Sequence, residues 1–78
     1  MAKSNTATTD RPKAVDVLTG ITEQALAYRF ADHTPTLADI VRVVGAASRV
    51  LRYDDVDERI SVENACVMSV AKRRNLIS

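Results

Sequence analysis

Residues 36–53 read TLADIVRVVGAASRVLRY, and this stretch decides the fold of the chain. Apolar side chains recur in it at helical spacing and cover about half of the helix circumference. They are Leu37, Ile40, Val41, Val43, Val44, Ala47, Val50 and Leu51. Thr36 and Asp39 have the spacing of a capping box, in which each side chain accepts a hydrogen bond from the other residue's backbone N–H. The stretch therefore predicts a continuous helix from Thr36 to Tyr53, with a wide apolar face that contacts neighbours on two sides.

A second helix is predicted upstream, over about residues 11–31. Thr9 or Asp10 can cap it, and Pro12 is favourable in the first turn because the N–H groups there have no partner within the helix. The face expected to be buried consists of Val15, Leu18, Ile21, Thr22, Ala25, Leu26 and Tyr28. Pro35 ends this helical pattern, since a proline disfavours helical geometry at the preceding residue.

A third helix is predicted downstream, from about Asp57 or Ser61 to Arg74. The acidic run at 54–58 precedes it or forms its first turn, and basic residues including Lys72 crowd its last turn. Both placements are favourable for the helix dipole. The face expected to be buried consists of Ile60, Val67, Met68 and Ala71, with Asn64 among them.

Together these segments predict an all-α fold, a small three-helix unit over residues 11–78 that follows a flexible leader at residues 1–10. A domain of this size lies near the margin of stability. Cys66 is the only cysteine and His33 the only histidine, so neither an internal disulfide nor a closed zinc site is available within one chain. We therefore expect dimerisation or docking onto a partner protein to complete the fold.

Charge and hydropathy limit the class of protein further. The chain carries 11 basic and 10 acidic residues and a formal net charge of +1, whereas a dedicated nucleic-acid binder normally has a clear basic excess. No apolar run approaches the roughly 20 residues that span a membrane, and no secretory signal is recognised. A cytoplasmic protein that does not bind membranes is the expectation.

Catalysis is not predicted. Asp32, His33 and Cys66 are the residues from which an orienting group, a base and a nucleophile could be assembled. However, Cys66 falls in the middle of a predicted helix, where a small packing residue is the simpler interpretation. Gly20 and Gly45 are the only glycines, so the chain has no glycine-rich phosphate loop, and no metal or cofactor is predicted.

The leading hypothesis is a non-enzymatic protein–protein interaction module that acts as a regulator, inhibitor or adaptor. Its basis is the apolar face of the 36–53 helix, which is wider than a lone three-helix unit of this size can cover. The predicted interface residues are Val41, Val43, Val44, Val50 and Leu51. The partner would be a second copy of the chain, a different protein, or both.

An alternative hypothesis comes from four pieces of sequence that follow one another in order: TLADI at 36–40, Gly45, SRVL at 48–51 and ISVE at 60–63. They resemble the helix-turn-helix motif of the lactose-repressor family, although about four residues that the family has between the glycine and the SRVL piece are missing. The resemblance implies a turn at Gly45 and a DNA-binding transcriptional regulator with an abbreviated motif. The residues it would bring to DNA, together with an arginine on the same face, are Arg42, Ala47, Ser48, Arg49 and Arg52.

Overall fold

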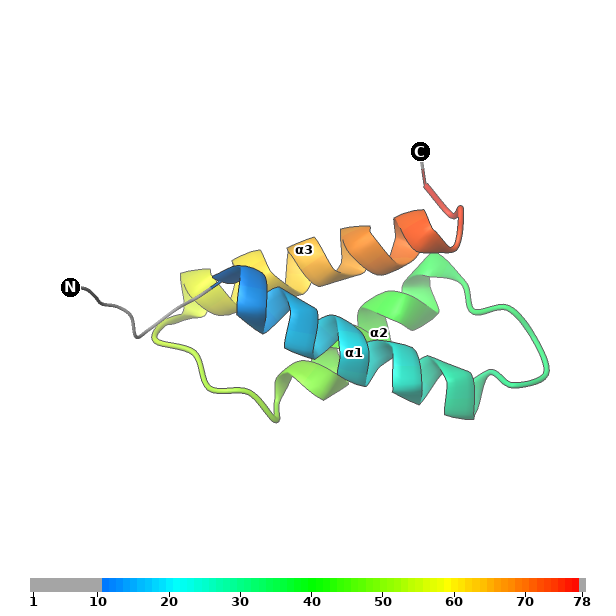
Figure 1. Cartoon of the computed structure of the whole chain (residues 1–78), viewed down its shortest axis with the longest axis horizontal. Helices are drawn as coiled ribbons and strands as arrows, with labels where there is room; N and C mark the ends of the chain where they lie inside the picture. The colour runs from blue at the N-terminus through cyan, green and yellow to red at the C-terminus, as the bar shows by residue number, and fades with distance from the viewer. Residues whose placement is uncertain (1–10, 78) are drawn as a thin grey trace.

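Three α-helices make up the described part of the chain, residues 11–77, in this computed structural model (Figure 1). They are α1 (Arg11–Arg29), α2 (Leu37–Ser48) and α3 (Val56–Arg73), and each helix packs against both of the others. The predicted all-α, three-helix fold is therefore confirmed. The leader predicted at residues 1–10 lies outside the described residues.

The first helix ends close to its predicted terminus. α1 stops at Arg29, two residues before the predicted Ala31, and Pro35 in the loop that follows is buried. In this loop the rings of Phe30 and His33 meet edge to face, with 5.1 Å between their centroids. This aromatic contact closes the turn between α1 and α2.

The second helix begins with the predicted capping box. The Thr36 side chain accepts a hydrogen bond from the Asp39 backbone N–H at 3.1 Å, and the Asp39 carboxylate accepts one from the Thr36 N–H at 2.9 Å. From there α2 runs through Gly45 without interruption, and Gly45 has no positive φ. The prediction of a continuous helix through Gly45 is confirmed, and the turn that the helix-turn-helix resemblance implies there is absent.

The end of α2 differs from its prediction, because the helix stops at Ser48 and not at Tyr53. Its last turn tightens through three hydrogen bonds of the i to i−3 type, at 3.1–3.3 Å, and the chain then leaves the helix axis. Leu51 and Tyr53 fold back to pack against the core, and the Tyr53 hydroxyl lies 2.9 Å from the Ser48 hydroxyl. Tertiary packing of these two side chains thus overrides the helical periodicity of the sequence.

The third helix has a cap at each end. Asp55 is the N-cap and accepts a hydrogen bond from the Glu58 backbone N–H at 2.8 Å, while the Glu58 carboxylate accepts one from the Asp54 N–H at 2.7 Å. At the other end Asn75 adopts a left-handed conformation with φ 59, and the Leu76 N–H reaches the Ala71 carbonyl at 2.9 Å. Both features are typical of helix termini, so the acidic run serves as a cap for α3.

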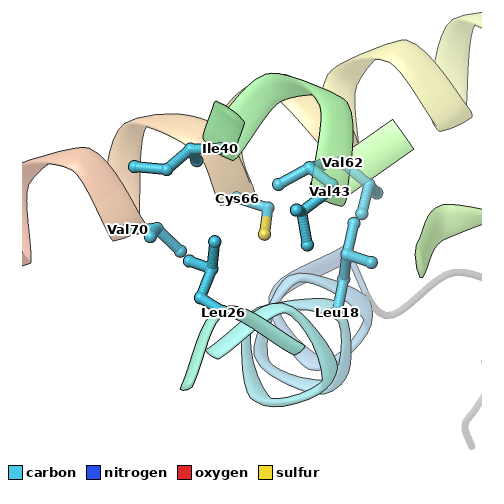
Figure 2. Close-up of a cluster of buried hydrophobic side chains, with 8 residues drawn as sticks. Leu18, Leu26, Ile40, Val43, Val62, Cys66 and Val70 are labelled. Carbon is cyan, nitrogen blue, oxygen red and sulfur yellow. The ribbon is translucent and has the colours of Figure 1, made fainter. Parts of the chain in front are cut away.

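The core lies where the three helices meet, as Figure 2 shows. α1 contributes Leu18 and Leu26, α2 contributes Ile40, Val43 and Val44, and α3 contributes Val62, Cys66 and Val70. The thiol sulfur of Cys66 also lies 3.6 Å from the Thr19 hydroxyl and 3.7 Å from the Thr22 hydroxyl, both on α1. These contacts give the buried hydroxyl groups a polar partner inside the core.

Two predicted faces need correction. On α3 the buried line passes through Val62, Cys66 and Val70, whereas Ile60 and Met68 remain 45% and 49% exposed. The reason is that α3 must contact α1 and α2 together, and the smaller residues of this line fit between the two helices. On α1, Tyr28 is 88% exposed, because its position falls beyond the edge of the face centred on Leu18, Thr22 and Leu26.

Candidate functional site

An open groove runs between α2 and the first half of α3, with a volume of about 820 Å³. One wall is formed by α2 and the other by α3, and the connection between them closes the end of the groove with Leu51 and Tyr53. None of the α1 residues whose side chains the structure describes, 13–29, lines it. The groove therefore exists because α2 ends early and the chain turns back toward the core before α3 begins.

The α2 wall combines apolar, small and basic residues. Val41, Gly45 and Ala46 line the groove, with Val41 52% exposed. A Cβ atom added at Gly45 would meet no other atom within 4 Å. The absence of a side chain at this position therefore leaves open space that a bound group can occupy.

Arg42 and Arg49 lie on the same wall and are both exposed. They are seven positions apart, about two helical turns or roughly 10.5 Å along the axis. Among the described residues neither makes an ion pair, unlike Arg59 and Arg74. The α2 wall thus presents two guanidinium groups that are not held in an ion pair with another described residue.

The α3 wall carries one apolar and three charged residues. Val56 is 61% exposed at the start of the helix. Arg59 and Glu63 pair with one another across one turn, with Nε and Oε2 3.8 Å apart, and Asp55 is engaged as the N-cap. None of these α3-side residues was predicted to belong to a site. The only signal in the sequence is Val56, an apolar residue inside the acidic run.

The predicted interface residues divide into two groups. Val41 and Val50 are exposed, at 52% and 69%, and Leu51 is half-buried at the end of the groove. In contrast, Val43 and Val44 are 4% and 1% exposed and belong to the core. They occupy the side of α2 that faces α1 and α3, so they offer almost no surface to a partner in this structure.

The residues that the helix-turn-helix resemblance would bring to DNA are also separated by the structure. Arg42, Arg49 and Arg52 are exposed. Ser48 is 2% exposed and its hydroxyl lies 2.9 Å from that of Tyr53, so it offers little surface to DNA although it is part of the groove lining.

The residues considered for catalysis lie in unlike environments. Cys66 is fully buried between the helices, as its interpretation as a packing residue predicts, while Asp32 and His33 are exposed in the loop after α1. Within residues 13–77 no group of three His, Cys, Asp or Glu side chains is arranged to hold a metal ion.

The carboxyl group of Asp39, at the start of α2, is perturbed by its hydrogen bonds in the capping box. Hydrogen bonding to the Thr36 backbone N–H, and then to the Thr36 side chain, holds its pKa below the usual value of 3.8. The nearby positive charge of Arg42 adds to this lowering. The Asp39 side chain is thus an ionised carboxylate whose hydrogen bonds are made within the capping box.

No helix among the described residues has the length and apolar character needed to cross a membrane. No protein-family model, curated protein or solved structure matches the chain. What the groove can bind therefore has to be inferred from its own residues.

Proposed function

We propose that this chain is a small non-enzymatic protein–protein interaction module, a regulator, inhibitor or adaptor, that binds a partner protein through the groove between α2 and α3. The observation that supports this most directly is the pair of exposed valines on opposite walls, Val41 at 52% and Val56 at 61%. Apolar side chains that line a concave surface favour binding because a partner removes them from water.

The shape of the groove favours a helical segment as the bound element. Two packed helices with a shallow channel between them are the usual receptor for an amphipathic helix, which lays its apolar face into the channel. The channel here is open to solvent, and Gly45 lets a partner side chain approach the α2 backbone closely. An enclosed pocket would instead favour a small molecule.

A different protein is favoured over a second copy of this chain. In a symmetric dimer the same patch meets itself, and a dimer in which α2 packs against α2 would bring Arg42 and Arg49 close to the same two arginines of the other copy. Like charges placed opposite one another oppose association. We therefore take the partner to be another protein and treat self-association as an outcome to be measured.

The test compares Val41→Glu with Val17→Glu. Val17 is a matched control because it is 44% exposed but lies on α1, away from the groove. Each purified variant and the wild-type chain would be used to isolate partners from the native source. Candidate partners would then be purified, and their affinities for all three proteins measured by calorimetry. The solution mass of each protein would be recorded over a concentration series.

A partner that binds the wild-type chain and Val17→Glu, but binds Val41→Glu at least roughly tenfold more weakly, is the expected result. Equal binding to all three would show that the groove is not the contact surface. If the wild-type chain is a dimer and Val41→Glu alone dissociates it, the partner is a second copy of the chain and not a different protein. A salt-sensitive complex with duplex DNA would favour the transcriptional-regulator alternative.

A further inference from the structure

The two walls of the groove differ in charge, and this difference bears on the chemistry of the partner. The α2 wall carries Arg42 and Arg49, which form no ion pair with another described residue. On the α3 wall Arg59 is paired with Glu63, and Asp55 caps the helix. A bound segment therefore meets two guanidinium groups without an ion-pair partner among the described residues on the α2 side only.

We propose that the groove binds an acidic amphipathic helix, whose carboxylates lie along the flank that faces α2. This proposal rests on the proposed function and specifies the partner. A helix lying alongside α2 presents side chains on that flank at two-turn intervals, similar to the seven-residue spacing of Arg42 and Arg49 in the sequence. The apolar residues between these carboxylates reach Val41 and the open space at Gly45.

The guanidinium groups are suited to carboxylates that are partly shielded from water. Arginine presents several donors in a planar fork that can bind a carboxylate through two hydrogen bonds. Beside the apolar wall, a bound helix would exclude water from one side of each contact and strengthen the attraction between the charges. The opposite flank of the same helix faces the balanced Arg59–Glu63 pair and Val56, so it needs no net charge.

A nucleic acid fits the same arginines less well. Asp54 precedes α3 and Asp57 lies in its first turn, both are exposed, and Asp55 between them lines the groove. A duplex carries closely and regularly spaced phosphates, so a backbone tracking Arg42 and Arg49 would also approach this acidic run. A helix with carboxylates at two places on one flank avoids that repulsion.

The experiment uses a displayed library of amphipathic helices of about 18 residues, long enough to span the described length of α2. Leucines would be fixed along one face, and the flanking positions would be randomised equally among Glu, Lys, Gln, Ser and Ala. Selection on the full chain at physiological ionic strength would be followed by affinity measurement of individual synthetic peptides. Each peptide would be tested on wild type, Val41→Glu and the double charge reversal Arg42→Glu/Arg49→Glu.

A second double reversal, Lys13→Glu/Arg29→Glu, provides the matched control. It makes the same change in net charge, but both positions are exposed on α1, outside the groove. Circular dichroism would check that all variants retain their helices. Duplex DNA at low salt would be titrated in parallel as the competing anion.

Enrichment of Glu on one flank, with affinity reduced roughly tenfold or more by Arg42→Glu/Arg49→Glu and little changed by the control, would support the proposal. Peptides that require Val41 but show no preference for Glu would overturn the proposal that the partner is acidic. The groove would still be a docking site in that case. If no selected peptide depended on Val41, the proposed function itself would fail. Binding of duplex DNA that only Arg42→Glu/Arg49→Glu abolishes would assign the arginines to nucleic acid and overturn the proposal.

Discussion

The hydroxyl groups of Ser48 and Tyr53 lie 2.9 Å apart and join the last residue of α2 to the connection that follows it. Ser48 is buried, whereas Tyr53 is half-buried and lines the groove. The contact therefore couples the end of the helix to the shape of the site. If Tyr53 moved away, both the terminus of α2 and the closed end of the groove would change.

Replacing Tyr53 with phenylalanine is expected to lower the free energy of unfolding by about 1–2 kcal/mol, because the buried Ser48 hydroxyl would lose its observed side-chain partner. Tyr28→Phe is the matched control, since the Tyr28 side chain is 88% exposed, and its effect should stay within about 0.5 kcal/mol. Urea unfolding of both variants would measure the difference. Equal effects would mean that the Ser48–Tyr53 contact does not stabilise the end of α2.

Val43 and Val41 provide a test of which side of α2 is buried. Val43→Ala should reduce the free energy of unfolding by about 2 kcal/mol, because it leaves a cavity beside a residue that is only 4% exposed. Val41→Ala removes the same atoms from a side chain that is 52% exposed and should cost less than about 0.5 kcal/mol. Thermal and urea unfolding would rank the two variants, and the reverse order would place the core on the other side of the helix.

Substitution of the two glycines separates an effect on helix stability from an effect on binding in the groove, because only Gly45 lines the groove. Gly20→Ala and Gly45→Ala should each raise the free energy of unfolding by about 0.5–1 kcal/mol, since alanine is the better helix former and an added Cβ meets nothing within 4 Å at either position. Only Gly45→Ala places a methyl group in the groove. Calorimetry with a groove-binding peptide should therefore show weaker binding for Gly45→Ala and unchanged binding for Gly20→Ala. Loss of stability in either variant would contradict the open space described at that glycine.

The capping box at the start of α2 makes the stability of the fold depend on pH. Since the pKa of Asp39 is below 3.8 in the folded chain, the ionised carboxylate stabilises the fold at pH values above the unfolded pKa. This contribution is lost as the pH falls through the lowered folded pKa. Asp39→Asn should therefore be less stable than wild type near neutral pH, and the gap should narrow below about pH 4. Melting temperatures between about pH 2 and 7 would test this, and a constant gap would exclude ionisation of Asp39 as its cause.

Local sequence signals were sufficient to predict the three helices. Thr36 and Asp39 mark the start of α2, and the acidic run places the start of α3, because caps and helix dipoles depend on residues close in sequence. The end of α2 could not be predicted in this way. It depends on Tyr53 reaching Ser48, and on Leu51 packing against the core, which are tertiary contacts.

The buried side of α3 was the least predictable part of the fold. Its apolar residues are spread around the helix, so Ile60 and Met68 were as acceptable in the sequence as Val62 and Val70. Only packing against two helices at once distinguishes them. The same dependence on packing between helices explains why only one side of the groove could be predicted from the sequence. Its α2 side, with Val41, could be recognised from one helix, whereas its α3 side becomes a wall only when both helices are in place.

Because Cys66 is buried, the reactivity of its thiol can be used to measure how often the helices separate in the unmodified protein. As the single cysteine, with a fully buried side chain, it can react with a thiol reagent only in molecules whose helices have separated. The rate of modification then measures how often the three helices come apart, without any added label. A ligand that occupies the native groove would slow that rate, because it withdraws molecules from the open state. Candidate partners can therefore be screened by whether they slow the modification of Cys66, before the identity of the partner is known.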